Sequence, residues 1–270
     1  MRWLALLVAA AAWGQTVVRQ GDAIRVRTPG PAVAARMDGR TVRLFVQPEG
    51  GRLGLMPVPV LKAPGSYALD LVASDGKVLS SGTVTVRDAH FPTQNVVLGK
   101  ATAGLKPSPG EMETVDAFLA AVSETRHWQE PLGVPVPGCI TSPFGVKRLR
   151  NGQPTGQTHG GLDQRTPAGR PVRAVADGVV KLVRLYNIHG GSVGIDHGQG
   201  LESMYLHLSR FAVAEGAAVR KGDVIGYSGS TGRSNAPHLH WSLYANGVPV
   251  NPLQWVALKP CPAVSDRVSH

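Results

Sequence analysis

The chain has 270 residues, 43% of them hydrophobic, which is enough for one large domain or for two ordinary domains with cores of their own. Its 33 glycines and 21 prolines, with only 6% aromatic residues, favour short strands and turns over long helices. The net charge of +10 favours an anionic partner such as nucleic acid, a membrane surface or a wall polymer. Because the sequence has no arginine-rich helix and no stacking platform for single strands, we expect no nucleic-acid partner.

Residues 1–15 have the pattern of a secretory signal peptide. Met1 and Arg2 form a short positive region, an apolar stretch rich in Leu and Ala runs from Leu4 to Trp13, and Gly14 and Gln15 follow. This stretch is too short for a stable membrane span, and no later stretch is long and apolar enough for one. We therefore expect an exported protein, periplasmic or extracellular, without stable membrane insertion after signal cleavage. A signal segment that stays as an anchor is the alternative.

Residues 16–96 alternate between apolar and polar side chains in short runs separated by turns. The alternating runs are residues 23–27, 41–46, 67–72 and 83–87. Turn signals such as Pro29-Gly30, Asp38-Gly39 and Asp75-Gly76 separate them. This spacing predicts an immunoglobulin-like β-sandwich. The segment has no catalytic constellation, so we expect an accessory domain.

Residues 97–131 form a linker followed by a helix. Lys106 to Gly110 is rich in Pro and Gly, and residues 111–126 then place apolar side chains at steps of three and four, namely Met112, Val115, Phe118, Leu119 and Val122. His127 and Trp128 end this pattern, and we interpret both as packing residues.

Residues 132–258 return to short strands and predict a compact antiparallel β domain, followed by a tail over residues 259–270. The only two cysteines, Cys139 and Cys261, flank this domain. In an exported protein they would form a disulfide that joins its two ends, and two separate thiols are the alternative. Their spacing is not that of a zinc site.

Six of the nine histidines fall between residues 159 and 240. His238 and His240 flank Leu239, so on a strand both would point to one face and Leu239 to the core. By the same alternation, His207 shares a face with Tyr205. Spacing alone does not assign different roles to these histidines.

His159 and Asp163 supply two more groups that bind zinc, and the glycines between them let the backbone bend so that both reach one ion. A His/Asp/His set with an open fourth position is what a catalytic zinc site needs, and spare histidines can move protons beside it. The chain has no His-Glu-x-x-His and no Gly-x-Ser-x-Gly, which excludes the helix-borne metalloprotease site and counts against a serine hydrolase.

From about Ile140 to Trp255 the chain resembles the M23 family of zinc metallopeptidases, of the lysostaphin and LytM type. Eight motifs occur in family order: TSPFG (141–145), HGGLD (159–163), PAGRPV (167–172), AVADGV (174–179), IDHG (195–198), MYLHL (204–208), VRKGD (219–223) and HLH (238–240). A β domain and a helix before the peptidase domain are also similar to exported members of this family.

The resemblance implies one zinc ion per chain, bound by His159, Asp163 and His240, with His207 and His238 as the catalytic pair. It implies hydrolysis of peptide bonds in peptidoglycan, in stem peptides, cross-links or bridges. Some members have a tyrosine shortly before the first zinc histidine, which this chain lacks; Gln153 and Gln157 lie there instead. The alternative is a catalytically silent LytM-like regulator that binds the wall or activates cell-wall amidases, and a wall-binding module with structural zinc is a third.

Other polar residues near the motifs are interpreted separately. Asn187 is expected to line the substrate groove, whereas His189 and His197 are expected to be structural, with His197 organising its turn. The basic residues of the stretch before His159, Lys147, Arg148 and Arg150, would face either substrate or solvent.

Overall fold

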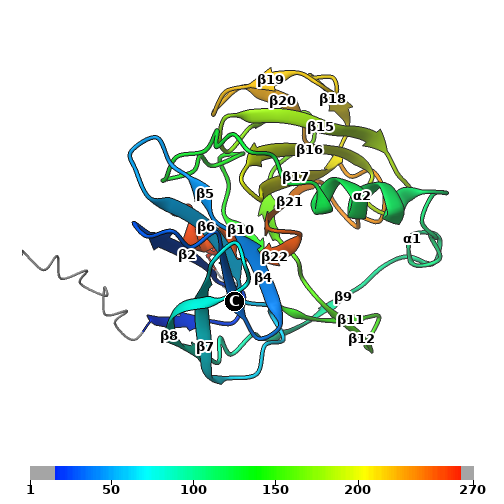
Figure 1. Cartoon of the computed structure of the whole chain (residues 1–270). Coiled ribbons are helices and arrows are strands. Elements are labelled where there is room, and N and C mark those ends of the chain that lie inside the picture. Colours follow the sequence, from blue (N-terminus) through cyan, green and yellow to red (C-terminus); the bar gives the residue numbers. More distant parts are fainter. Residues whose placement is uncertain (1–15, 263–270) are drawn as a thin grey trace, which may run out of the picture.

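The computed structural model describes residues 16–262, so the predicted signal peptide and most of the predicted tail lie outside the described residues. Within this range the protein is mainly β, as predicted, and its strands form two groups of sheets that lie against each other (Figure 1). No helix within residues 16–262 is long and apolar enough to cross a membrane.

The N-terminal part is built from two sheets. The first has five strands in the order β1-β8-β7-β3-β4: β1 Thr16–Arg19, β8 Val78–Arg87, β7 Gly65–Val72, β3 Ala34–Met37 and β4 Arg40–Arg43. The second has three strands in the order β2-β6-β5: β2 Ala23–Thr28, β6 Arg52–Pro57 and β5 Phe45–Val46. The two sheets share one core of alternating apolar side chains, including Val26, Met56 and Leu69. The immunoglobulin-like topology stays a prediction.

The prediction of a single strand over residues 41–46 is wrong. This stretch is divided into β4 and β5, which belong to different sheets. Between them Leu44 is fully buried, and its N–H donates to the carbonyl of Val33. The chain changes sheets at Leu44, and alternation of apolar residues does not reveal such a change.

The C-terminal part is organised around an eight-stranded sheet whose strand pairs are all antiparallel, as predicted. Its order is β10-β13-β21-β17-β16-β15-β19, with β22 paired to β21. The strands are β10 Ile140–Ser142, β13 Leu162–Arg165, β21 His238–Ala245, β17 Leu201–Leu208, β16 Gly191–Gly198, β15 Gly178–Leu185, β19 Ala218–Val219 and β22 Val248–Val250. A 3₁₀ turn, Pro252–Gln254, follows β22.

Two small sheets complete this part. One has the order β14-β20-β18: β14 Pro171–Arg173, β20 Val224–Tyr227 and β18 Arg210–Phe211. The other has the order β12-β11-β9: β12 Gln153–Thr158, β11 Lys147–Arg150 and β9 Thr93–Val96. Because β9 pairs in parallel with β11, the chain that leaves the N-terminal sheets is hydrogen-bonded directly into the C-terminal part.

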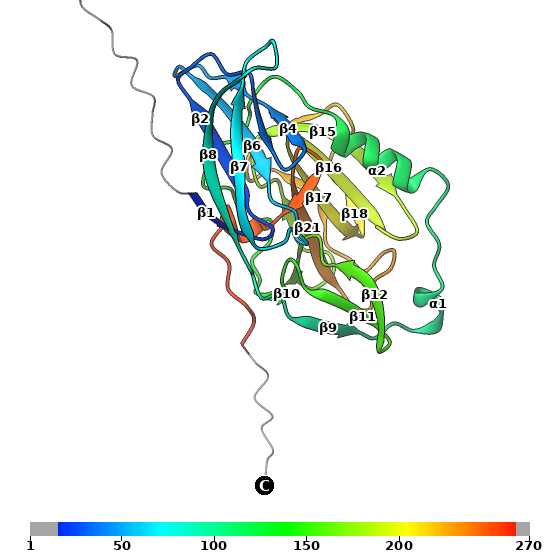
Figure 2. The same cartoon turned by 60° about the horizontal axis from the view of Figure 1, so that its bottom comes forward.

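The linker continues through the short helix α1, Lys100–Ala103, to α2, Glu111–Ala120 (Figure 2). In α2, Val115, Phe118 and Leu119 pack against the sheet, on Leu182, Tyr186, Met204 and Leu206. The helix is shorter than the predicted 111–126, and Met112 and Val122 are exposed. It ends because the next residues bond to the sheet: Ser123 donates to Asp196 and accepts from the N–H of Gln199.

A disulfide joins Cys139 to Cys261. Beside it, the N–H of Ile140 donates to the carbonyl of Lys259, and the N–H of Cys261 donates to the carbonyl of Ile140. The described end of the chain is thereby fixed to β10, at the edge of the sheet next to β13.

Candidate metal centre

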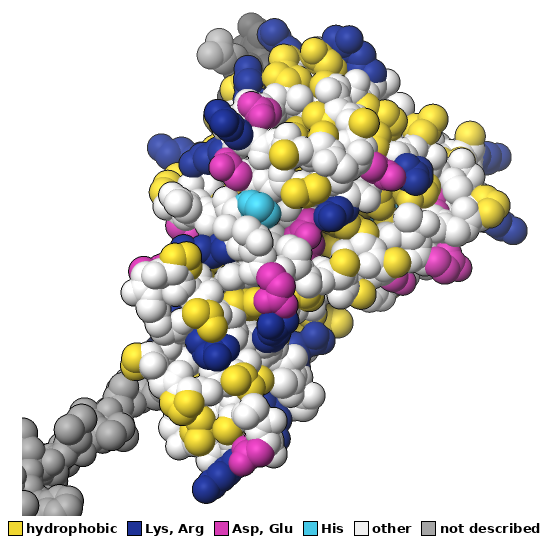
Figure 3. All heavy atoms as spheres, turned by 45° about the horizontal axis from the view of Figure 1, so that its top comes forward, with side chains coloured by type: hydrophobic (Ala, Val, Ile, Leu, Met, Phe, Trp, Pro, Cys, Tyr) yellow, Lys and Arg dark blue, Asp and Glu magenta, His cyan; other side chains and the backbone are white. Residues whose placement is uncertain are grey.

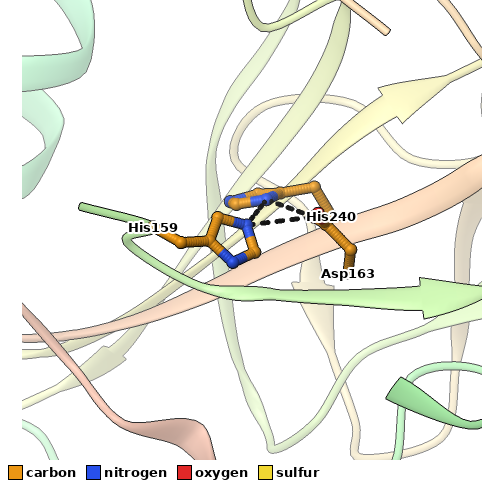
Figure 4. Close-up of side chains that lie close together, drawn as sticks. All are labelled: His159, Asp163 and His240. Carbon is orange, nitrogen blue, oxygen red and sulfur yellow. Dashed lines mark hydrogen bonds and ion pairs between the residues drawn. The ribbon is translucent and has the colours of Figure 1, made fainter. Parts of the chain in front are cut away.

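The three predicted ligands converge at adjacent strands. Asp163 on β13 lies directly opposite His240 on β21, and His159 precedes β13 by three residues. His159 Nε2 lies 3.0 Å from Asp163 Oδ1, His240 Nδ1 lies 2.9 Å from the same oxygen, and the two ring nitrogens are 3.0 Å apart (Figure 4). The close approach requires glycine at position 161, where a Cβ would lie 2.4 Å from Ser242 Oγ.

The other ring nitrogens of these two histidines already have partners. His159 Nδ1 lies 2.8 Å from the carbonyl of Pro143 and donates to it, and His240 Nε2 lies 2.9 Å from Ser242 Oγ. His159 therefore directs a lone pair toward Asp163, and His240 does the same in the tautomer whose Nε2–H donates to Ser242 Oγ. With both lone pairs turned inward, two ring nitrogens and a carboxylate oxygen face one another at about 3 Å and offer three donor atoms to one cation. The donor set fits zinc, which takes His nitrogen and carboxylate oxygen.

The protonation states suit a cation. Burial opposes ionisation of Asp163, but its interactions with His159 and His240 outweigh burial and hold the pKa of this carboxyl well below its usual range. Burial lowers the pKa of His240 to about 4, although Asp163 opposes this shift. At neutral pH the centre therefore presents a carboxylate and a neutral imidazole.

The second oxygen of Asp163 is held by Arg148 on β11. Arg148 Nη2 lies 3.1 Å from Asp163 Oδ2, and Arg148 Nη1 donates to Gln94 Oε1 at 2.7 Å. Ser142 Oγ donates to the same Gln94 oxygen at 2.7 Å. Oδ1 of Asp163 is thereby left facing the two histidines. Neither Gln94 nor Ser142 was predicted as part of the site. Arg148 was predicted to face either substrate or solvent, and it pairs with Asp163.

His207 and His238 lie beside these ligands, with ring centroids 4.9 Å apart. The prediction that His207 and Tyr205 share one face of their strand is wrong. Tyr205 points into the core, where its hydroxyl accepts from the N–H of Val175. The pairing of β17 with β16 shifts register near His207, which has φ +61°, and this irregularity turns the imidazole to the opposite face.

The ring orientations of this pair are set by backbone carbonyls. His207 Nδ1 donates to the carbonyl of Thr231 at 2.8 Å, and His238 Nδ1 donates to that of Ala236 at 2.7 Å. Nε2 of each ring is left with a lone pair. Burial, with smaller effects from His238 and His240, lowers the pKa of His207 to about 3, so this ring is neutral at neutral pH.

All five residues line one groove with a volume of about 360 Å³. Its walls come from β9, β11 and β12 on one side and from the loop before β21 on the other. Tyr244 and Ser242 also line it, on the same face of β21 as His238 and His240. Alternation along β21 would have identified these two residues as part of the site.

Three other predicted residues lie away from the centre. Asn187, expected to line the groove, is exposed and does not line it, whereas its neighbours Ile188 and His189 do. His189 is held by Glu111, with Nδ1 2.7 Å from Oε1. His197 is fully buried, between the carbonyl of Asp177 and Ser203 Oγ.

Three metal-type ligands beside two histidines with free ring nitrogens, on a mainly β scaffold, are the arrangement of a metal-dependent hydrolase. Comparison with known proteins agrees, since the model of "Peptidase family M23" matches residues 157–252. The C-terminal part of the chain is therefore a peptidase M23 domain. The resemblance predicted from the motifs is confirmed.

Two curated relatives match less than half of the chain. The DD-carboxypeptidase/endopeptidase Mpg of Neisseria meningitidis is 49% identical over 114 residues, which are 42% of this chain and 26% of that protein. The peptidoglycan DD-endopeptidase ShyA of Vibrio cholerae is 41% identical over 115 residues, which are 43% of this chain and 27% of that protein. The matched region thus spans about a quarter of the length of these relatives.

A crystal structure from Pseudomonas aeruginosa, described as a peptidase M23, is similar over both parts. It is 28% identical at a TM-score of 0.68, and the alignment covers 87% of this chain and 93% of that one. The N-terminal sheets and the linker are therefore shared with that structure as well as the peptidase domain.

Proposed function

We propose that this protein is an exported zinc metalloendopeptidase that hydrolyses peptide bonds in peptidoglycan, with zinc held by His159, Asp163 and His240. The observation that carries the proposal is that three potential metal-binding atoms lie within about 3 Å of one another. They lie in the same groove as the His207 and His238 pair. A complete ligand set favours an enzyme over a catalytically silent regulator.

The names of the relatives support the substrate class. ShyA is a peptidoglycan DD-endopeptidase and Mpg a DD-carboxypeptidase/endopeptidase. The net charge of +10 suits an anionic wall polymer. On the face shown in Figure 3, Lys and Arg side chains are spread among other residues, which suits broad attraction to a polymer.

The chain's own residues supply proton transfer. His207 is neutral at neutral pH and keeps a lone pair on Nε2, so it can accept a proton from the water that attacks the scissile carbonyl. His238 has the same tautomer, and its Nε2 lies 3.8 Å from Asp163 Oδ1, at the edge of the centre. We propose that this pair takes the proton from water and returns it to the leaving amine.

Zinc bound at the three ligands would polarise the scissile carbonyl and lower the pKa of water. The protein's contribution to that chemistry is orientation. Pro143 and Ser242 fix the two ligand rings, and Arg148 fixes the carboxylate through its second oxygen. Because these partners are already in place, little reorganisation is needed when the ligands bind the ion.

A zymogram on purified sacculi tests the proposal. We expect the zinc-loaded protein to clear the gel, a chelator to abolish clearing, and added zinc to restore it. Mass analysis of the released muropeptides would then identify the bond that is cut. Binding to sacculi without any released muropeptide would contradict the proposal and favour a wall-binding module with structural zinc.

A further inference from the structure

Two arginines in the groove have no acidic partner. Of the three arginines that line it, Arg148 is paired with Asp163, the only acidic residue of the lining. Arg150 and Arg233 also line the groove, are half-buried, and make no side-chain hydrogen bond or ion pair within residues 16–262. Half-buried guanidinium groups without a counter-charge are costly, which points to an anion supplied from outside.

These two arginines come from opposite walls of the groove. Arg150 ends β11, where it pairs with Val96 of β9, and Arg233 lies in the loop before β21, with its N–H bonded to the carbonyl of Ile188. The walls meet near this point, since Asn235 Nδ2 lies 3.5 Å from the carbonyl of Val97. Burial and, next, the charge of Arg150 lower the pKa of Arg233, so the two guanidinium groups influence each other.

The surroundings strengthen binding of an anion. Val96, Leu98 and Ile188 also line the groove, so apolar side chains lie among its lining residues beside these arginines. In apolar surroundings a hydrogen bond between guanidinium and carboxylate is stronger than at an open surface. The planar fork of the guanidinium also matches the two carboxylate oxygens. The charge of Glu111 also acts on Arg233, but within residues 16–262 Glu111 forms no ion pair with either arginine. Its carboxylate accepts from the N–H groups of Ser108, Ile188 and His189 and lies 2.7 Å from His189 Nδ1.

We propose that Arg150 and Arg233 form a subsite for a free carboxylate of the substrate peptide, next to the catalytic histidines. This inference rests on the proposed function, because it takes the substrate to be a stem peptide with free carboxylates. The protein would then select cross-linked peptides whose carboxylates are free over peptides in which they are amidated.

Binding without turnover gives the first test. The probes are a purified cross-linked muropeptide dimer and the same dimer with its carboxylates converted to amides. We expect the zinc-loaded His238→Ala protein to bind the free-acid dimer at least about tenfold more tightly by calorimetry, as expected for loss of a charge-assisted bond. Adding Arg233→Gln or Arg150→Gln should bring the affinity for the free-acid dimer down to that for the amidated dimer.

Arg40→Gln in the same background is the matched control, because Arg40 is exposed on β4, far along the chain from the groove, and its loss changes the net charge equally. It should keep the preference for the free-acid dimer. Equal affinity for the two dimers in His238→Ala, no measurable binding of the free-acid dimer, or a preference that survives both arginine substitutions would overturn the subsite.

Measurements of turnover distinguish failure of the carboxylate subsite from failure of the proposed function. If the zinc-loaded wild-type protein cleaves neither dimer while binding still depends on the carboxylates and on both arginines, the subsite stands and the peptidase proposal fails. If it cleaves both dimers with equal kcat/KM and binds them equally, the peptidase proposal stands and the subsite fails.

Discussion

The two histidines of β21 lie two residues apart and face different partners. His240 Nδ1 is 2.9 Å from Asp163 Oδ1, whereas the His238 ring lies beside His207. We expect His240→Ala to weaken zinc binding by more than about 100-fold, since even loss of an outer partner of a ligand costs up to that much. His238→Ala should keep zinc and lower kcat by about 10²- to 10⁴-fold, the usual range for loss of a proton-transfer group.

Metal content after dialysis against buffered zinc, measured together with kcat on a cross-linked muropeptide, distinguishes the two variants. His90→Ala is the control, because His90 is exposed and lies outside the groove. Full zinc occupancy in His240→Ala would show that the ligand assignment is wrong.

Glu202 on β17 is an acid without a partner. It is fully buried, and neither carboxyl oxygen has a hydrogen bond within the described residues. Burial, followed by the charge of Asp196, raises its pKa from 4.5 to about 9. The folded protein therefore keeps a proton that the unfolded chain releases, so the stability from Glu202 is full below pH 4.5 and is lost as the pH rises toward 9.

We expect Glu202→Gln to remove this pH dependence. The free energy of unfolding of the variant should equal that of the wild type near pH 4.5 and exceed it at alkaline pH. The difference in free energy should grow by up to about 1.4 kcal/mol per pH unit. Urea unfolding across this window measures the difference. Glu113→Gln on the exposed side of α2 should show no such trend; a parallel pH profile in Glu202→Gln and the wild type would exclude a raised pKa.

At the scale of elements, α2 holds the loop between β15 and β16 through Glu111. This side chain is fully buried and accepts from the N–H groups of Ser108, Ile188 and His189. The carbonyl of His189 in turn accepts from the N–H of His207, so the same loop supports the proposed catalytic residue. Loss of Glu111 would leave buried N–H groups without an acceptor.

We therefore expect Glu111→Ala to lower the free energy of unfolding by about 3–5 kcal/mol, as for removal of one partner from a buried charged network. The reduction should appear in urea unfolding together with a lower kcat, because His207 loses its support. Glu113→Ala, two residues along the same helix and exposed, should change neither quantity appreciably. Equal stabilities of the two variants would contradict the role of Glu111.

Local pattern predicted the elements well where one face of a strand is buried against one core. It correctly predicted that His238 and His240 share one face of β21 with Leu239 in the core, because side chains alternate along a strand. It failed for the side of His207, since a register shift within β17 breaks the alternation and has no signature in the local sequence. It extended α2 too far because Ser123 bonds to the sheet in place of the helix.

The site could be predicted only in part for a related reason. His159 and Asp163 are close in sequence, and the ordered motifs associate them with His240. The contact of Arg148 with Gln94 joins residues 54 positions apart, on strands that pair only in the folded protein. Such a contact depends on tertiary pairing, so neither composition nor periodicity indicates it.

At the scale of the whole molecule, β6 belongs to two cores. Leu53 and Leu55 point into the core of the peptidase domain, whereas Met56 points into the core between the two N-terminal sheets. Hydrogen bonds cross the same boundary: Asn246 Nδ2 donates to the carbonyl of Leu55 and the N–H of Asn251 donates to that of Gly21. The N-terminal sheets are thus continuous with the peptidase domain in packing and in hydrogen bonding.

Because β6 is shared, we expect the two parts to unfold together in one transition. Leu55→Ala should lower the free energy of unfolding by about 3 kcal/mol, and Met56→Ala, which faces the other core, should shift the same transition by a similar amount. Differential scanning calorimetry of the wild type and both variants measures this coupling. Two separate transitions, with Met56→Ala moving one of them and leaving the other in place, would show that the N-terminal sheets are an independent module and do not stabilise the peptidase domain.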